Sequence, residues 1–328
     1  MTYFLVYNEC MKVVVLGKGL MLANIVLGAL DAGAEIVGVF RYEQTSTNPI
    51  KLFIKDMLCS APEVTLLKKL KLNEIKMKSA NSKEFRKLMV KLNVDLIIVG
   101  TWKEKLTKET FNIPKIATVN VHPSLLPKYR GPNPYMQTIL QGEEYSGITL
   151  HLMDENFDSG PILAQEKIKI LPEDTSKELR ERTVKEARKL IRELITDLND
   201  KIITPIQQNE KAATYFANIS GDEKMIDFST QSSDEISRTV RALHPFLPCY
   251  ITHKKDYFII NPYKIKILQH KSSDYKPNDI IAKNAKTSSL TIICKDNNAI
   301  AFSDLKLYKK PLRTKKYIEK HVKITCEQ

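Results

Sequence analysis

The first two hundred residues alternate short apolar runs rich in β-branched residues with longer segments whose apolar residues recur at helical spacing. This alternation is typical of successive βαβ units, because the strands of a parallel sheet are buried on both faces and the connecting helices are amphipathic. Strands are expected at 12–16, 35–40, 95–99, 118–121 and 148–153, and helices at 20–32, 82–91, 134–140 and 175–198. The pattern predicts an α/β domain with a doubly wound, mostly parallel sheet.

The periodicity stops at about 201–215, where polar residues take over and mark a linker. Beyond the linker, one helix is expected at 233–243, followed by short β-rich runs at 249–252, 257–261, 264–268, 279–281, 290–295 and 300–305. Short, regularly spaced strands favour a small antiparallel β-barrel of the OB type. The expected organisation is an N-terminal extension at 1–10, a catalytic domain at 11–202, a linker at 203–218 and a barrel domain at 219–328.

Composition excludes several classes of protein. The five cysteines lie far apart, without a C-x-x-C pair or a His/Cys cluster, so neither a metal site nor a disulfide framework is expected. No apolar run reaches the roughly 18 residues that span a bilayer. The first ten residues lack a basic segment and contain Glu9, which argues against a cleaved signal peptide. A soluble, cytoplasmic protein is therefore expected.

Three polar residues are candidates for a shared site. Asn120 and His122 stand two positions apart at the end of the strand expected at 118–121, so their side chains leave the same face of the strand. Open α/β sheets bind ligands at the carboxyl edge, which is where this strand ends. Asp158 lies in a D-S-G-P turn after the strand expected at 148–153, and its side chain can point back over the same edge.

The residues from Asn120 to Gly131 read N-x-H-x-S-L-L-P-K-Y-R-G, and the turn at Asp158 follows 38 positions after the asparagine. This combination resembles the formyltransferase family, which includes methionyl-tRNA formyltransferases, sugar-nucleotide formyltransferases and glycinamide ribonucleotide transformylase. The resemblance implies a folate-dependent enzyme with 10-formyltetrahydrofolate as its co-substrate. It also implies a catalytic set of Asn120, His122 and Asp158, and a folate contact made by Ser124, Leu125, Leu126 and Pro127.

In the chemistry that the resemblance implies, an amine attacks the formyl carbon and an oxyanion develops. An amide N–H of Asn120 aimed at that oxygen would stabilise it. The imidazole of His122, with an ordinary pKa of about 6.5, is suited to relay the proton that the amine loses, while Asp158 orients the ring. This scheme needs no metal and no covalent intermediate. His151, on the preceding strand, is expected to have a structural role.

The resemblance extends into the second half of the chain, at 213–215, 225–229 and 241–246. It is shared with methionyl-tRNA formyltransferases and one branch of sugar formyltransferases, whereas glycinamide ribonucleotide transformylase lacks this domain. From Ala242 onward the chain carries 17 Lys and Arg against 7 Asp and Glu, a surplus that favours a polyanionic partner. The resemblance thus implies a bacterial, monomeric enzyme that formylates methionyl-tRNA during translation initiation.

Two alternatives stay open at the level of sequence. The tRNA enzymes usually carry a glycine-rich basic run after the second strand, and 41–58 lacks it. This departure keeps open N-formylation of an amino-sugar nucleotide. An RNA-binding protein without catalytic activity is the alternative of another class, and the intact set of Asn120, His122 and Asp158 speaks against it.

Overall fold

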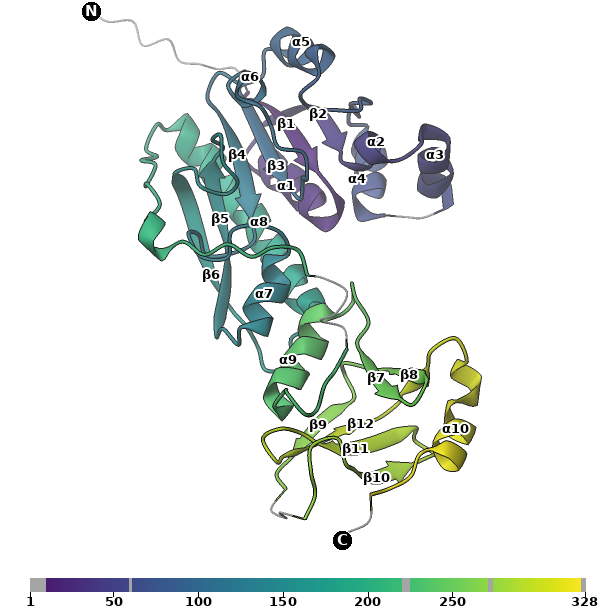
Figure 1. Cartoon of the computed structure of the whole chain (residues 1–328). Coiled ribbons are helices and arrows are strands. Elements are labelled where there is room, and N and C mark those ends of the chain that lie inside the picture. The colour runs from purple at the N-terminus through teal and green to yellow at the C-terminus, as the bar shows by residue number, and fades with distance from the viewer. Residues whose placement is uncertain (1–9, 59–60, 220–224, 271–273, 326–328) are drawn as a thin grey trace, which may run out of the picture. The chain divides into compact units, whose positions relative to one another are not determined.

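A computed structural model of the protein describes residues 10–58, 61–219, 225–270 and 274–325 (Figure 1). Apart from Cys10, the extension expected at 1–10 lies outside the described residues. The chain forms two compact units, each assembled from three chain segments. Unit 1 comprises Met1–Pro134, Ser146–Lys169 and Arg180–Phe216, and unit 2 comprises Tyr135–Tyr145, Ile170–Leu179 and Ala217–Gln328. The boundaries expected at 202 and 219 stay predictions.

Unit 1 is organised around a six-stranded sheet with the strand order β2-β1-β3-β4-β5-β6. The strands are β1 (Lys12–Gly17), β2 (Glu35–Arg41), β3 (Leu96–Gly100), β4 (Ala117–His122), β5 (Tyr145–Leu152) and β6 (Ile162–Lys169). The pairs β1–β2, β1–β3 and β3–β4 are parallel, whereas β4 and β5 are antiparallel. β1 and β3 are buried almost throughout, as expected for central strands of a sheet covered on both faces.

Helices cover both faces of this sheet. Its helices are α1 (Gly19–Asp31), α2 (Glu43–Ser46), α3 (Pro49–Leu58), α4 (Pro62–Leu70), α5 (Lys83–Leu92), α6 (Lys108–Phe111) and most of α8 (Ser176–Asn199). Val14 and Leu16 of β1 share a core with Phe85 of α5. The position after Leu16, Gly17, faces Leu22 of α1 instead. Alternate residues of one strand thus face helices on opposite sides, which is the doubly wound arrangement.

The region after β2 contains a buried ion-pair cluster. Arg41, at the end of β2, is 3% exposed and pairs with Asp56 of α3 and with Glu74. The outward face of α3 is strongly apolar, because Phe53 is 70% exposed and Leu58 is 73% exposed. The segment that lacks a basic, glycine-rich run therefore contains a helix, α3, that is paired with the end of β2 through the guanidinium of Arg41.

Unit 2 contains two antiparallel sheets. One has the order β10-β11-β12-β9 and the other has the order β13-β8-β7. Their strands are β7 (Tyr250–His253), β8 (Asp256–Ile259), β9 (Ile265–Leu268), β10 (Ile280–Asn284), β11 (Ser289–Ile293), β12 (Ala299–Phe302) and β13 (Lys306–Leu307). The helices are α7 (Pro134–Leu140), α9 (Ser233–Leu243) and α10 (Thr314–His321), with a 3₁₀ turn at Pro311–Arg313 before α10.

One hydrophobic core joins the two sheets to the helices of unit 2. Phe258 and Phe302 lie in it together with Ile236 of α9, Ile318 of α10 and Met136 of α7. α9 begins with a capping box, in which Ser232 and Glu235 satisfy each other's backbone N–H groups. Because Met136 lies in this core, the core depends on α7, which precedes α9 and the strands of unit 2 by many residues along the chain.

The predicted fold class is confirmed: a mostly parallel α/β sheet is followed by a small antiparallel β domain. The sequence did not predict β6, α3, α4 or α10. β6 is only half-buried and rich in polar residues, so it lacks the apolar run that identifies the inner strands. None of the helices in the described part of the chain combines the length and apolar content that a membrane crossing requires.

Candidate active site

The candidate residues of the site lie where β4 ends. β4 runs parallel to β3 and antiparallel to β5, so the direction of neighbouring strands changes at this strand. Asn120 and His122 leave its carboxyl end, and His151 of β5 is the direct cross-strand partner of Asn120. Cross-strand partners share a face of the sheet and place their side chains next to each other.

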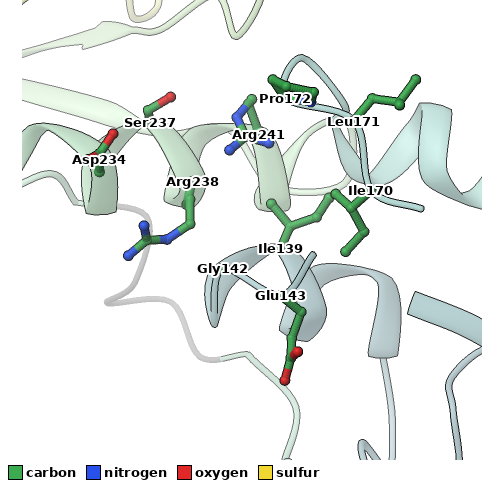
Figure 2. A pocket seen from close by; sticks show the side chains of 10 residues that line it. All are labelled: Ile139, Gly142, Glu143, Ile170, Leu171, Pro172, Asp234, Ser237, Arg238 and Arg241. Carbon is green, nitrogen blue, oxygen red and sulfur yellow. The ribbon is translucent and has the colours of Figure 1, made fainter. Parts of the chain in front are cut away.

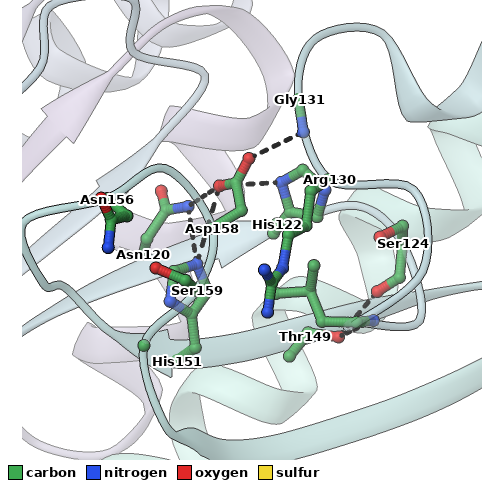
Figure 3. A network of polar contacts seen from close by, with 12 residues as sticks. Asn120, His122, Ser124, Arg130, Gly131, Thr149, His151, Asn156, Asp158 and Ser159 are labelled. Carbon is green, nitrogen blue, oxygen red and sulfur yellow. Dashed lines mark hydrogen bonds and ion pairs between the residues drawn. The ribbon is translucent and has the colours of Figure 1, made fainter. Parts of the chain in front are cut away.

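Asp158 reaches the same place from the loop between β5 and β6. The loop is shaped by Asp154, whose carboxylate accepts hydrogen bonds from the backbone N–H of Asn156 and from the hydroxyl of Ser159. Asp158 itself adopts a left-handed backbone conformation, with φ of 57°. This turn directs the carboxylate back toward β4, as Figure 3 shows.

The Asp158 carboxylate is the centre of a polar network (Figure 3). Its Oδ1 lies 3.3 Å from His122 Nδ1 and accepts a hydrogen bond from Asn120 Nδ2 at 3.2 Å. Its Oδ2 accepts the backbone N–H of Gly131 at 3.0 Å. The three residues expected to form the catalytic set are therefore brought together, although they are spread over 38 positions of the chain.

The protonation of His122 follows from its partners. His122 Nε2 lies 2.9 Å from the carbonyl oxygen of Tyr129, and a carbonyl only accepts, so Nε2 carries a proton. Burial disfavours the charged imidazole, but the Asp158 carboxylate outweighs it and raises the pKa of His122. Burial likewise works against the Asp158 charge, but His122 and the Gly131 N–H hold the pKa of that carboxyl well below its usual range. The two side chains form a buried imidazolium–carboxylate pair.

The polar segment at 208–216, which precedes the last stretch of unit 2 along the chain, is attached to the loops of this site. Gln208 Nε2 donates to the backbone carbonyls of Asp158 and Gly160 at 2.9 and 2.8 Å. Arg130 binds both Gln208 and Glu210, and Phe216 stacks on Tyr129 with 5.1 Å between ring centroids. The residues expected to form a linker thus hold the backbone of Asp158 and cover the loop that holds His122.

Gly131 shows why the motif ends in glycine. A Cβ at this position would lie 2.5 Å from the backbone oxygen of Phe216 and 2.9 Å from the ring of Tyr215. The residue also has φ of 94°, a conformation that favours glycine. Glycine at this position lets the incoming segment pack directly on the backbone whose N–H binds Asp158.

The segment from Ser124 to Pro127, expected to contact folate, forms a loop with its own hydrogen bonds. Ser124 is fully buried and its hydroxyl donates to the carbonyl of Lys128. The N–H of Leu126 donates to Thr149 Oγ1, and its carbonyl accepts from Gln165. The hydroxyl of Ser124 is therefore committed within the loop, and the folate contact stays a prediction for Leu125, Leu126 and Pro127 and for the backbone of Ser124.

Two contributors to the site were not identified from the sequence. His151 was assigned a structural role, yet its Nε2 lies 3.0 Å from Asn120 Nδ2 and 3.8 Å from Asp158 Oδ1. The alternation of β5 could show that His151 faces the site only once the register of β5 against β4 was known. Gln208 lies in a segment without periodicity and gave no signal.

Unit 2 contains a separate hollow of about 230 Å³, lined by Arg238 and Arg241 of α9 (Figure 2). Arg238 donates to the carbonyl of Leu140, and Arg241 donates to the carbonyl of Asp174 at 2.8 Å. Glu143 and Asp234 also line the hollow, so its charge is mixed. These arginines join the three chain segments of unit 2.

In the described residues, no group of three or more His, Cys, Asp or Glu side chains is arranged to hold a metal ion.

Comparison with known proteins identifies the family. Residues 11–195 match the model of the formyl transferase family, and residues 218–322 match that of the formyl transferase C-terminal domain. The chain belongs to the formyl transferase family. The resemblance predicted from the motif is thereby confirmed.

Proteins similar in sequence to this formyl transferase include several methionyl-tRNA formyltransferases. The protein from Agathobacter rectalis is 34% identical over 59% of this chain and 62% of its own length. The match therefore spans less than two thirds of the length of that relative. The one from Clostridium novyi is 32% identical over 72% of this chain and 74% of its own. The one from Clostridium tetani is 28% identical over 86% of this chain and 84% of its own.

Solved structures of similar fold include sugar-modifying members. WlaRD, a sugar 3N-formyl transferase, covers 92% of this formyl transferase and 100% of its own chain, with a TM-score of 0.64 and 16% identity. An N-formyltransferase from Helicobacter canadensis covers 89% of this chain and 99% of its own, with a TM-score of 0.62 and 18% identity. At such identities the likeness concerns the fold alone.

Proposed function

We propose that this formyl transferase moves the formyl group of 10-formyltetrahydrofolate to the amino group of methionyl-tRNA. The observation that carries the transfer chemistry is the buried pair of His122 and Asp158 at the end of β4, with Asn120 beside it. The acceptor is supported by relatives named methionyl-tRNA formyltransferases, which align across both halves of the chain. A monomer is proposed with it.

In the proposed reaction, the amine nitrogen attacks the formyl carbon, and the carbonyl oxygen takes up negative charge. The nitrogen then gives a proton to the Asp158 carboxylate. The bond from the formyl carbon to N10 of the folate breaks, and the proton passes to N10, so that formylated amine and tetrahydrofolate are the products.

The structure alters the role expected for His122. Its two ring nitrogens face acceptors, the carbonyl of Tyr129 and the carboxylate of Asp158, and the carboxylate raises the pKa of the ring, so His122 is not a free base. Once Asp158 has accepted the proton, the imidazolium charge is no longer balanced. The resulting positive charge lies next to the reacting centre, where it stabilises the oxyanion. His122 and Asp158 therefore act as one proton-holding unit.

The proposed acceptor also fits the surface of unit 2. Around the turn Pro311–Arg313 and α10, the basic side chains are exposed: Lys309, Lys310, Arg313, Lys315 and Lys316. Phosphate contacts from Lys and Arg dominate the affinity of proteins for nucleic acids. This cluster supports a contact with the tRNA backbone.

An amino-sugar nucleotide is the second candidate acceptor. It is favoured by the exposed apolar residues of α3, which lie in the segment where the tRNA enzymes usually carry a basic run. To separate the two, the full chain is incubated with 10-formyltetrahydrofolate and either charged initiator tRNA or amino-sugar nucleotides, and the products are analysed by mass spectrometry. Addition of one formyl group to the methionyl-tRNA is the expected result. Formylation of sugars alone would remove the tRNA proposal, and no product with any amine would favour the non-catalytic RNA-binding alternative.

A further inference from the structure

His151 has a defined tautomer. Its Nδ1 lies 2.8 Å from the carbonyl oxygen of Leu152, and because a carbonyl only accepts, Nδ1 must carry the proton. The ring is 2% exposed, so water does not compete for this contact. The lone pair of Nε2 is then directed at Asn120 Nδ2, 3.0 Å away. His151 is therefore an acceptor toward Asn120.

Asn120 has both of its amide N–H groups engaged inside the protein. One is donated to His151 Nε2 and the other to Asp158 Oδ1. A rotation of the amide by half a turn would place its oxygen against a lone pair and a carboxylate, which are both acceptors. The two partners together therefore fix which end of the amide faces inward.

The remaining atom of the amide is Oδ1. Figure 3 shows it pointing away from Asp158 and His151, and among the described residues it has no hydrogen-bond partner. Because Oδ1 and Nδ2 belong to one planar amide, Oδ1 stays close to the Asp158 carboxylate that Nδ2 contacts. The site thus presents a carbonyl acceptor next to a carboxylate acceptor.

We infer that His151 is a positioning residue that holds Asn120 with its carbonyl oxygen toward the substrate, where it accepts an N–H of the attacking amine. The inference rests on the proposed function. One N–H of the amine is bound by Asn120 Oδ1 and another by Asp158, which later takes that proton. With both N–H groups held, the nitrogen lone pair is directed at the formyl carbon. This role replaces the contact from Asn120 N–H to the oxyanion that the sequence suggested.

The turn after Asp158 preserves the contact that sets this tautomer. At Gly160, a Cβ would lie 1.9 Å from the carbonyl oxygen of Leu152 and 3.5 Å from His151 Nδ1. Only glycine leaves that carbonyl where His151 can donate to it. The glycine of the D-x-G turn thereby connects the loop of Asp158 to the tautomer of His151.

Two substitutions in the full chain separate the acceptor atom of His151 from the rest of the ring. H151N keeps an amide near the position of Nδ1, where it can donate to Leu152, but it does not extend to Asn120. H151Q places an amide oxygen near the position of Nε2 and restores an acceptor for Asn120. Loss of one positioning hydrogen bond should decrease kcat/KM for the amine acceptor about 10- to 100-fold, which corresponds to about 1.4–2.7 kcal/mol at a factor of ten per 1.36 kcal/mol. We expect that decrease for H151N, with the KM for formylfolate unchanged, and recovery to within several-fold of wild type for H151Q.

A double-mutant cycle with N120A tests whether His151 acts through Asn120. The expected result is that H151N lowers kcat/KM in the wild-type background but not in the N120A background. Independent, multiplying losses would overturn the inference, and so would wild-type activity of H151N. A loss in H151N and N120A that is confined to kcat, with the KM for the amine unchanged, would return Asn120 to the oxyanion and equally overturn it.

Melting temperatures of all variants identify losses that come from unfolding. If H151N does not fold, H151Q alone decides: activity within several-fold of wild type supports the inference, and a loss as large as that of N120A overturns it. Wild-type activity with methionyl-tRNA, measured in the same assay, tests the proposed function separately. The inference depends only on the ratios of kcat/KM between variants, and these can be measured with whichever amine the wild type accepts.

Discussion

Replacing Asp158 with asparagine removes the charge at the centre of the site and keeps the shape of the side chain. The carboxylate receives His122 Nδ1 and Asn120 Nδ2 on one oxygen and the N–H of Gly131 on the other. An asparagine offers only one oxygen, so at least one of these donors would meet an N–H. The imidazolium of His122 would also lose its counter-charge, and burial would then favour the neutral ring.

The pH dependence of stability follows from the directions of the two pKa shifts. The folded pKa of Asp158 is lowered, so its contribution is present above about pH 4 and is lost as the pH falls further. The folded pKa of His122 is raised, so its contribution is fully present below about pH 6.5 and is lost as the pH rises through the folded pKa. Both contributions are therefore present between about pH 4 and 6.5.

The expected loss of unfolding free energy in D158N is largest in this pH range. Removing one partner of a buried ion pair costs about 3–5 kcal/mol, so D158N should lose that much unfolding free energy near pH 5.5. Above the raised pKa of His122 the wild-type ring is neutral as well. The difference should then shrink to the cost of the lost hydrogen bonds, about 1–2 kcal/mol.

The single tryptophan of the chain provides the assay. Trp102 packs edge-on against Phe40 with 5.1 Å between ring centroids, so its fluorescence reports on the core of unit 1. Urea unfolding of wild type and D158N is followed by this signal at several pH values from 5 to 9. D31N is a matched control, because Asp31 pairs with Arg188 at the surface, where such a pair contributes about 0.2–1 kcal/mol. A difference between D158N and wild type that stays constant over this range, or grows as the pH rises, would refute the assignment of an imidazolium–carboxylate pair.

Three further predictions concern other parts of the chain. R41M should lower the unfolding free energy by about 3 kcal/mol in urea titrations, because it leaves two partly buried carboxylates without a counter-charge; R41K should recover only part of this, since Lys cannot bridge both carboxylates as a guanidinium does. G160A should lower turnover strongly while the protein still folds, because a Cβ there overlaps the carbonyl of Leu152 and the loop must move; wild-type kinetics would contradict this. K310A and K315A should each weaken methionyl-tRNA binding and reduce the slope of affinity against salt by about one, measured by filter binding at several salt concentrations, with the KM for formylfolate unchanged as the control.

Much of unit 1 could be predicted from the sequence, because its inner strands are buried on both faces and leave continuous apolar runs. The ends of β1, β2 and β3 were predicted to within about two residues for this reason. β6 was missed because an edge strand needs no such run. α3 was missed because its apolar residues face outward, so its pattern did not mark a buried face.

The site was predictable only as far as local geometry reaches. The spacing of Asn120 and His122 determines their shared face, and the turn at Asp158 brings in the third side chain. The role of His151 depends on the register of β5 against β4, which no local pattern fixes. The free oxygen of Asn120 depends in turn on the tautomer of His151, which a carbonyl in the next residue determines.

The way unit 2 is assembled limits how this enzyme can be recombined with its relatives. Met136 of α7 belongs to the same core as Phe258, and the arginines of α9 are bound by backbone carbonyls of Leu140 and Asp174. A chimera that exchanged only the last hundred or so residues would set a foreign α9 against a host helix and turn shaped for another partner. Successful grafting of unit 2 between family members therefore requires the exchange of three stretches of chain together, and evolution by simple domain shuffling is correspondingly constrained.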